Sequence, residues 1–315
     1  MQQVDASWQQ HASDQLLLSV VIPSYNYATV LPRCIDSVLV QLTDACELIV
    51  VDDGSKDGTL ELLRGWDCGP QRAAYLSQEN CGPSAARNAG LAASSGRWLL
   101  FLDADDVMAA GALAAILQQL QACPDTDLLL GGHLDCAEDG SSRYHAPGQI
   151  PQAVSLRLDD FLLKKRFGIC HGSSVFSRAR LMLRPYPEDL RQGEDLAVFA
   201  FMLSSSVVSV LDAPLVWIYK HADSLRNHLE LDASHGDRVA AAVFERLPDE
   251  FQHRRHAFRA QRQLSLFRSC YLAGLRSEAL ACYGRAWRLA PRMACRWDYF
   301  SKWLRLLLGR RGVRH

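Results

Sequence analysis

The stretch Trp98-Leu99-Leu100-Phe101-Leu102-Asp103-Ala104-Asp105-Asp106 decides the fold that the sequence predicts. Five apolar residues run without a break into three carboxylates. An apolar run of this length fits a strand that is buried on both faces of a parallel sheet. In open α/β sheets, ligands bind just beyond the carboxyl ends of the strands. The sequence therefore places Asp103 and Asp105 where a substrate would lie.

The acidic end of this stretch has two interpretations. Like charges this close are costly unless something positive joins them. A hard divalent cation, bound by oxygen ligands and itself holding substrate phosphates, would supply that charge. The alternative is an N-cap and an acidic first turn for a helix that begins near Met108. The stretch alone leaves both interpretations open.

The sequence on both sides alternates short apolar runs with helical patterns. Strands and helices that alternate at this spacing predict an α/β fold, a doubly wound and mostly parallel sheet with helices on both faces. The predicted strands are residues 16–23, 47–51, 73–77, 98–102 and 127–131, and the predicted helices are residues 30–42, 59–66, 84–95 and 109–121.

Beyond residue 131 the periodicity is looser. Residues 138–151 predict a loop or hairpin over the site, and residues 207–211 and 215–219 predict a hairpin. From about residue 229 the pattern is wholly helical. The predicted organisation is a flexible N-terminus at residues 1–15, an α/β domain at residues 16–228 and a basic, helical C-terminal region at residues 229–315.

Composition narrows the class of protein. The chain has 315 residues, of which 49% are hydrophobic, so a substantial core is available. Its ten cysteines show no CxxC and no paired zinc-type spacing, which predicts free thiols in a reducing compartment. Residues 1–14 lack the basic and apolar segments of a signal peptide. No stretch of about 18 apolar residues predicts a spanning helix.

The C-terminal region is strongly basic. Residues 252–315 carry 15 Lys and Arg against two acidic residues, although the whole chain has a net charge of −1. In residues 296–315, aromatic residues and leucines alternate with Lys and Arg, a pattern that predicts an amphipathic, cationic helix. Such a helix fits an anionic membrane surface. The alternative is a helix packed on the α/β domain with a solvated basic face. No nucleic-acid-binding module accompanies the charge, so nucleic acid is not an expected partner.

Five motifs, in this order, resemble those of the family 2 glycosyltransferases. They are SVVIPSYN at residues 19–26, VVDDGSKDGT at 50–59, GPSAARNAG at 82–90, DADD at 103–106 and GED at 193–195. The resemblance covers roughly residues 19–227. It implies an inverting enzyme of the GT-A fold that uses a nucleotide-sugar donor, with residues 16–228 as its glycosyltransferase domain.

The resemblance implies a nucleotide site after the first two predicted strands. In the family, a proline and an aromatic residue there lie against the nucleotide, which points to Pro23 and Tyr25, with Asn26 beside them. The first carboxylate after the second strand contacts the base, which points to Asp52. An aspartate can accept a hydrogen bond from N3–H of uracil, so a UDP-sugar is favoured. The alternatives are a packed loop aromatic for Tyr25 and, for Asp52 and Asp53, a turn that caps the next helix.

The resemblance also implies a metal site. Asp103, Ala104 and Asp105 match the family's DxD element, whose carboxylates hold Mn²⁺ or Mg²⁺ against the donor diphosphate. Such a metal would neutralise the leaving nucleoside diphosphate. His221 lies where many family members have a histidine, and it would complete the metal shell or contact the diphosphate. A surface or core histidine is the alternative for His221.

Arg87 is the predicted cation beside the donor diphosphate. It lies among small residues, so a helix end can approach a ligand closely and the guanidinium can pair with phosphate oxygens. The alternative is a salt bridge to Asp103 or Asp106. Both can hold in the same site.

Glu194 and Asp195 are the predicted acceptor-side residues. An inverting transfer needs a carboxylate that takes a proton from the attacking hydroxyl. In relatives the aspartate of this pair has that role, so Asp195 is the predicted base, and Glu194 supports it or contacts the acceptor. The alternative is simple capping of the apolar helix that begins there.

The resemblance implies a hexosyl- or N-acetylhexosaminyltransferase that acts on a saccharide or lipid-linked saccharide in the assembly of a bacterial surface polysaccharide, lipopolysaccharide or glycan. We expect it in the cytoplasm, either free or peripheral on the inner face of the cytoplasmic membrane. One rival is a sugar nucleotidyltransferase, although the loop after the first strand lacks the glycine-rich, basic sequence of that class. The other rival is a catalytically silent scaffold that acts through its helical tail. No G-x-G-x-x-G follows a strand, which argues against a dinucleotide-binding dehydrogenase.

Overall fold

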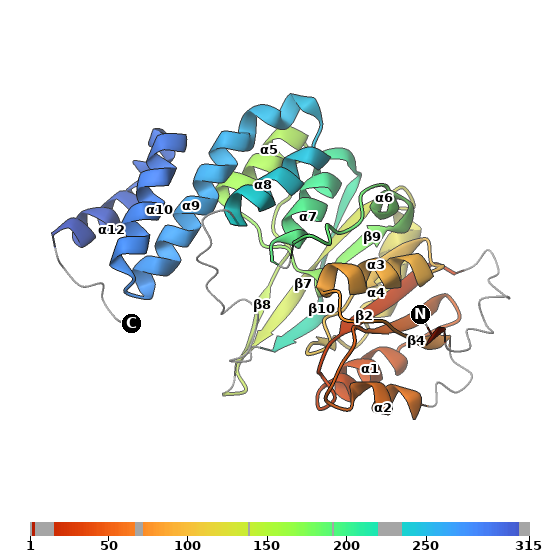
Figure 1. Ribbon diagram of the computed structural model, residues 1–315. Helices are drawn as coiled ribbons and strands as arrows, with labels where there is room; N and C mark the ends of the chain where they lie inside the picture. Colours follow the sequence, from red (N-terminus) through yellow and green to blue (C-terminus); the bar gives the residue numbers. More distant parts are fainter. Residues whose placement is uncertain are drawn as a thin grey trace.

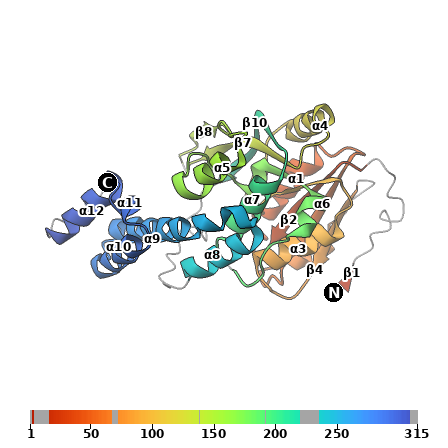
Figure 2. The ribbon, with the colours of Figure 1, turned by 90° about the horizontal axis from the view of Figure 1, so that it is seen from above.

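The computed structural model describes residues 2–3, 16–66, 72–137, 139–190, 192–219 and 235–308. Within these ranges, ten strands form one sheet with helices on both faces (Figures 1 and 2). The strands are β1 (Gln2–Gln3), β2 (Leu18–Ser24), β3 (Cys46–Asp52), β4 (Ala73–Ser77), β5 (Trp98–Phe101), β6 (Val107–Met108), β7 (Leu128–Cys136), β8 (Ser142–His145), β9 (Ser174–Ser177) and β10 (Val208–Tyr219). The predicted fold class is confirmed.

The order of strands across the sheet is β1-β4-β3-β2-β5-β9-β7-β10-β6, and β8 pairs with β7. Strands β4, β3, β2 and β5 are parallel neighbours. Strand β9 is antiparallel to both β5 and β7, so β7 and its parallel neighbour β10 run in the same direction as β5. The carboxyl ends of β2, β3, β5, β7 and β10 therefore face one edge of the sheet, where ligands of α/β proteins bind.

The central strands are buried on both faces, as their continuous apolar runs predict. Strands β3 and β5 are buried along their whole length, and in β2 Pro23 alone is partly exposed. The helices are α1 (Leu31–Leu39), α2 (Thr59–Arg64), α3 (Pro83–Ala93), α4 (Ala112–Ala122), α5 (Val154–Leu158), α6 (Arg178–Leu183), α7 (Glu194–Ser205), α8 (His235–Arg246), α9 (Arg255–Leu272), α10 (Arg276–Leu289), α11 (Pro291–Ala294) and α12 (Trp297–Leu307). Side chains of α1, α2 and α4 pack on one face of the sheet, and those of α3 and α5 to α8 pack on the other.

Helix α3 lies very close to β2. A Cβ atom added at Gly90 would lie 2.3 Å from Cγ1 of Val21. Glycine at this position lets the helix approach the strand, and the preceding turn of α3 carries Arg87 to Asp103 at the carboxyl edge of the sheet.

The hairpin predicted for residues 207–219 is wrong. These residues form the single strand β10, which pairs in parallel with β7 along its length. The pairing shifts between Leu211 and Pro214 and again between Pro214 and Val216. Proline has no N–H to donate to the ladder, so the strand is irregular there. The two apolar runs are thus two halves of one irregular strand.

The helix that would begin near Met108 does not begin there. Val107 and Met108 form β6, which pairs antiparallel with β10. Helix α4 begins at Ala112, with Gly111 as its N-cap. The acidic residues 103–106 therefore do not cap a helix, and that alternative is wrong.

The C-terminal helices divide between two cores. Apolar side chains of α8 and of α9 as far as Phe258 belong to the same core as α7. The rest of α9 packs with α10, α11 and α12 in a second core around Phe267 and Tyr283. In Figures 1 and 2, α10 and α12 project away from the sheet. The domain boundary at residues 228–229 stays a prediction. Among the described helices, none has the length and apolar character needed to cross a bilayer.

Candidate active site

The loops that follow β2 and β3 are fastened to each other. The backbone N–H of Asn26 donates to Oγ of Ser55 (2.9 Å), and the N–H of Lys56 donates to Oδ1 of Asn26 (2.8 Å). Asn26 adopts a left-handed backbone conformation (φ 60°), which asparagine tolerates better than most residues. Asn26, which is predicted to bind the nucleotide-sugar donor, thus shapes the loop around its neighbours.

Tyr25 stands at the surface of this loop. Its side chain is 41% exposed, so the alternative of a packed loop aromatic does not hold. Pro23, at the end of β2, is partly exposed beside it. An open aromatic ring next to a fixed loop is suited to stacking on a planar base.

Asp52 and Asp53 have different partners, and neither caps α2. Asp52 is fully buried, and its carboxylate accepts from the N–H of Ser55 (3.2 Å) and the hydroxyl of Ser77 (3.2 Å). The Asp53 carboxylate accepts from the side chain of Gln78 (2.7 Å) and from two backbone N–H groups, those of Cys81 (2.9 Å) and Gly82 (2.8 Å). Asp53 therefore holds the loop before α3. The helix-capping alternative is wrong for both residues.

Three carboxylates gather after β5. Burial raises the pKa of Tyr27 to about 12, with Asp105, Asp103 and Asp106 adding to the effect. The pKa of the buried Cys34 thiol is raised for the same reasons. Both groups therefore lie in the negative potential of one acidic cluster.

The members of this cluster differ in exposure. Asp103 and Asp105 are half-buried, whereas Asp106 is buried and its Oδ1 accepts from the N–H of Tyr219 in β10 (3.2 Å). Ala104, between them, is 1% exposed and packs in the apolar core on one face of the sheet. Asp103 and Asp105 are thus the carboxylates placed to receive a cation.

Arg87 joins the acidic cluster to the start of α7. Its Nη2 lies 3.2 Å from Oδ1 of Asp103, and its Nη1 lies 2.9 Å from Oε1 of Glu194. Burial alone would lower the pKa of Arg87, but Asp103, Tyr186 and Glu194 raise it above its ordinary value. The salt bridge to Asp103 is confirmed. Contact between Arg87 and a donor phosphate stays a prediction.

Glu194 and Asp195 are the first two residues of α7, and neither is its N-cap. The N-cap is Gly193 (φ 77°), and the Glu194 side chain is directed to Arg87 instead. Burial, and then the Asp195 charge, raise the pKa of Glu194, while Arg87 opposes them. Asp195 is half-buried, and its Oδ1 accepts from the N–H of Leu196 (2.8 Å). His221, the third predicted metal ligand, lies outside the described residues.

The sequence did not reveal Tyr186. This fully buried side chain lies under Arg87, whose guanidinium carbon is 5.5 Å from the ring centroid. The ring also meets Phe101 of β5 edge to face, at 5.4 Å. Asn88 of α3 holds the backbone of Tyr186 from both sides, with Oδ1 accepting from its N–H and Nδ2 donating to its carbonyl, each at 2.9 Å. Nothing in the irregular stretch around Pro185 and Pro187 signals this support.

Comparison with known proteins relates the chain to glycosyltransferases. The sequence profile of Glycosyl transferase family 2 matches residues 19–182. Glycosyltransferase GlyG of Streptococcus pneumoniae serotype 4 is 25% identical over 244 residues, which is 74% of this chain and 80% of that protein. The succinoglycan biosynthesis protein ExoO of Rhizobium meliloti is 29% identical over 288 residues, 84% of this chain and 81% of that protein.

One solved structure extends the likeness to the fold. Residues 1–349 of S. aureus TarS, in complex with UDP-GlcNAc, superimpose with a TM-score of 0.67 at 16% identity. The match covers 93% of this chain and 92% of that one, so the two share a fold over nearly their whole length.

Proposed function

Since the chain belongs to glycosyl transferase family 2, we propose that it moves a sugar, with inversion, from a nucleotide-sugar donor to a hydroxyl of a saccharide or lipid-linked saccharide. The observation that carries this proposal is the Arg87 bridge. It holds Asp103, on the donor side, and Glu194, next to the predicted base, in one buried network. Residues predicted to serve the donor and the acceptor, from distant parts of the chain, thereby lie together at the carboxyl edge of the sheet.

The donor is proposed to be a UDP-sugar. Tyr25 offers an exposed ring, and Asp52 lies at the end of the adjacent strand. The relationship to TarS, whose complex contains UDP-GlcNAc, supports the same nucleotide. The polysaccharide role in the name of ExoO supports a saccharide acceptor in a bacterial glycan.

The acidic cluster fits a hard divalent cation. Its donor set is carboxylate oxygen, the ligand type that Mg²⁺ and Mn²⁺ prefer. Burial is the main cause of the raised pKa of Tyr27, and the charges of Asp105, Asp103 and Asp106 add to it, which supports a negative potential at the cluster. Asp103 and Asp105 would hold the ion, which supplies positive charge to the departing diphosphate.

Asp195 is the proposed general base. Its carboxylate would take the proton of the acceptor hydroxyl as the oxygen bonds to the anomeric carbon, and the bond electrons leave with the nucleoside diphosphate. The bridge between Arg87 and Glu194 fixes the first turn of α7, so Asp195 is positioned by a buried ion pair one residue away.

A cavity lined in part by Leu196, the residue after Asp195, suits an anionic acceptor. It has a volume of about 260 Å³, and its other lining includes Lys165, Gln261, Arg262 and apolar side chains. Burial lowers the pKa of Lys165, and the Arg262 and Arg268 charges lower it further. This cationic surrounding fits an acceptor that carries phosphate, as a lipid-linked saccharide does.

The first test is donor hydrolysis and nucleotide binding. Purified protein would be incubated with UDP-, GDP- and dTDP-sugars in Mn²⁺ or EDTA, with nucleotide binding measured in parallel by calorimetry. We expect slow release of UDP, reduced about a hundredfold or more by EDTA or Asp105→Asn. Asp195→Asn should slow hydrolysis while leaving UDP affinity unchanged.

The matched control is Asp298→Asn, which removes an exposed carboxylate on α12. It should behave as wild type. Release of a nucleoside triphosphate from donor and pyrophosphate would instead identify a nucleotidyltransferase. If no nucleotide binds, the silent scaffold is the better account.

The helical end of the chain is proposed to contact an anionic membrane. On α12, Trp297 is 72% exposed, and Leu304 and Leu307 are exposed as well. Basic side chains alternate with them, which fits the inner face of the cytoplasmic membrane. Sedimentation with phosphatidylglycerol vesicles, but not with phosphatidylcholine vesicles, would support this contact. Equal binding of Trp297→Ser/Leu307→Ser and wild type would contradict it.

A further inference from the structure

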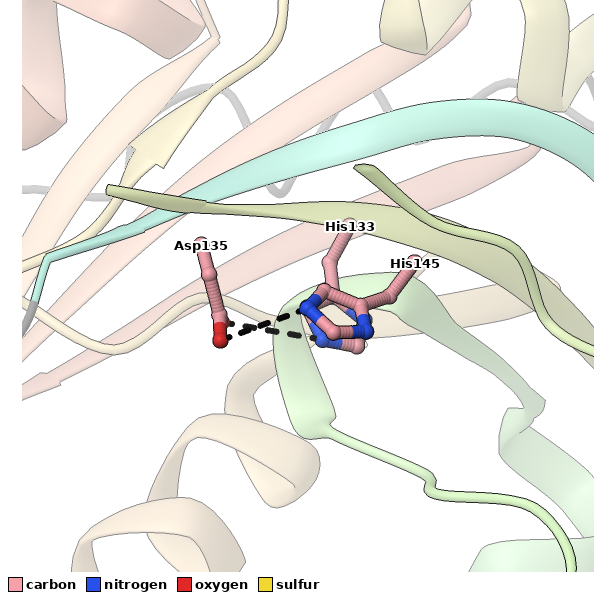
Figure 3. A group of neighbouring side chains, drawn as sticks. All are labelled: His133, Asp135 and His145. Atoms are coloured by element: carbon pink, nitrogen blue, oxygen red, sulfur yellow. Dashed lines mark ion pairs between the residues drawn. The ribbon is translucent and has the colours of Figure 1, made fainter. Parts of the chain in front are cut away.

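Two histidines and an aspartate meet on the hairpin of β7 and β8 (Figure 3). His133 and Asp135 are two residues apart on β7, so their side chains lie on the same face of the strand. His145, at the end of β8, is the antiparallel register partner of His133. The three side chains therefore share one face, near the carboxyl end of β7.

The atoms of this cluster are close enough to share one ion. Nε2 of His145 lies 3.4 Å from Oδ2 of Asp135, and Nε2 of His133 lies 3.8 Å from Oδ1. One ligand atom from each residue lies within 4.8 Å of those of the other two. Ligand atoms around a tetrahedral zinc ion are about 3.3 Å apart, as bond lengths of about 2.0–2.1 Å require. Side-chain rotations that move the ligand atoms by roughly an ångström would close the difference.

The arrangement of the two imidazole rings bears on what the cluster can bind. The two imidazole rings are stacked, with centroids 4.9 Å apart and planes 11° from parallel. Two protonated rings in this arrangement would repel each other beside a single carboxylate. Nε2 of His145 is buried from solvent and makes no hydrogen bond within the described residues. The lone pair of a neutral imidazole lies in the ring plane, so one ring must turn out of the stacked orientation for both to bind one ion. That ion would give Nε2 of His145 a partner.

We propose that His133, Asp135 and His145 bind Zn²⁺, with water in the fourth position. Imidazole nitrogen with one carboxylate is a ligand set of the borderline first-row metals, whereas Asp103 and Asp105 offer oxygen alone. The two sites thus select different ions. This proposal does not depend on the chemistry proposed for the acidic cluster.

The zinc ion would fasten β8 to the sheet. Strand β8 buries little: Ser142, Arg143 and Tyr144 are exposed. On its other face, the Tyr144 hydroxyl donates to Oδ1 of Asp212 in β10 (2.7 Å). Zinc would add a second attachment on the face of His145. The ion is therefore assigned a structural role in the hairpin.

The test is a cobalt titration of metal-free protein made without a polyhistidine tag. Four-coordinate Co²⁺ with nitrogen and oxygen ligands gives visible d–d bands and no sulfur-to-metal charge transfer. We expect one equivalent of Co²⁺ to give this spectrum and Zn²⁺ to displace it. His145→Asn and His133→Gln should each weaken Co²⁺ binding about a hundredfold or more. Circular dichroism would confirm that each variant is folded.

Two controls separate this site from others. His256→Asn removes an exposed histidine on α9, and Asp105→Asn alters the acidic cluster. Both should keep the wild-type spectrum and affinity. In wild type, Zn²⁺ should also slow amide exchange in β8, and His145→Asn should abolish that effect. Absence of the cobalt spectrum, a thiolate spectrum, or unchanged affinity in both His145→Asn and His133→Gln would overturn the proposal.

Discussion

Arg87 shows how much of the site depends on one side chain. Its two terminal nitrogens hold carboxylates on α7 and after β5, and a lysine ammonium cannot form both contacts in the same geometry. We predict that Arg87→Lys lowers kcat of donor hydrolysis by about ten- to a hundredfold, with a smaller change in KM. Steady-state kinetics with the donor found in the first test would measure this split.

Loss of the charge at position 87 should affect the free energy of unfolding differently from replacement of arginine by lysine, which keeps the charge. Arg87→Met would leave Asp103 and Glu194 without their partner, at a cost of about 3–5 kcal/mol in the free energy of unfolding. Urea unfolding of both variants would compare them. Equal destabilisation by lysine and methionine would show that the bridge is held by packing on Tyr186 and not by charge.

Glu47 gives the fold a pH dependence that can be isolated. This buried carboxylate accepts from the Ser19 hydroxyl (2.5 Å) and from the N–H of Ser95 (2.6 Å). Burial raises its pKa above the usual 4.5, and these hydrogen bonds oppose the rise. A raised pKa favours folding of the protonated form. The contribution is present below about pH 4.5 and is lost as pH rises through the folded-state value.

Glu47→Gln is the matched substitution, because it is uncharged at every pH. We predict that the stability of Glu47→Gln relative to wild type increases as pH rises from about 4 to 8. Urea unfolding of both proteins at several pH values would measure the difference, and other titrating groups cancel in it. A difference that stays constant with pH would contradict the raised pKa.

At the level of residues, the sequence identified the functional side chains but not which of them contact each other. Arg87, Asp103 and Glu194 were all singled out, and the salt bridge from Arg87 to Asp103 was one stated alternative. The contact between Arg87 and Glu194 was not foreseen, since the two residues are 107 positions apart. Tyr186 was missed because the residues next to a tyrosine in the sequence do not show whether its side chain is buried.

Helix α3 offers a test of close packing between elements. A Cβ at Gly90 would overlap Val21 of β2, with Cγ1 at 2.3 Å. We predict that Gly90→Ala lowers the free energy of unfolding by about 1–3 kcal/mol, even though alanine favours a helix. Adding Val21→Ala should recover part of the loss. Thermal and urea unfolding would measure both effects.

Gly284 of α10 is the matched control. A Cβ there meets nothing within 4 Å. Gly284→Ala should therefore stabilise the protein by up to about 1 kcal/mol, as helix propensity alone requires. If both alanines have the same effect, the close approach of α3 to β2 is not what requires glycine at position 90.

At the level of elements, patterns confined to one element were predictable and pairings were not. Strands β2 to β5 and helices α1 and α3 follow continuous apolar runs and helical spacing, so the sequence located them to within a few residues. The hairpin assigned to residues 207–219 failed because Pro214 interrupts an alternating pattern without ending the strand. Strand β6 has two residues and depends on β10 for its existence.

Of the three hydrophobic cores formed by the described residues, α9 joins two. Phe199 of α7 lies in the core of the sheet, whereas Phe267 of α9 lies in the core of the C-terminal helices. We predict that Phe267→Ala, a loss of about 3–5 kcal/mol locally, speeds amide exchange in α10 and α12 and leaves donor hydrolysis unchanged. Phe199→Ala should instead speed exchange in β5 and β9.

Hydrogen exchange followed by mass spectrometry would locate each effect. Faster exchange of the whole chain in Phe267→Ala would show that the two cores unfold together. That result would contradict the independence of the C-terminal helices.

At the level of the whole molecule, the fold class was predictable from the sequence but the strand order was not. The prediction of a doubly wound sheet rested on alternating elements and on family resemblance. It did not place β9 antiparallel between β5 and β7, because pairing of such short strands depends on the assembled sheet. The charge of residues 252–315 was visible at once. The way α9 divides between two cores was not.

The continuity of α9 sets a fixed distance within the molecule. Its 18 residues span about 27 Å at about 1.5 Å per residue. One end is embedded beside α8 and the other beside α10, so the helix acts as a rigid spacer. A surface held by α12 would thus lie at a constant height from the catalytic edge. The distance between that surface and the catalytic edge would then depend on the length of α9. Inserting two turns in α9 would change the length of the acceptor that the enzyme serves, without changing a residue of the site.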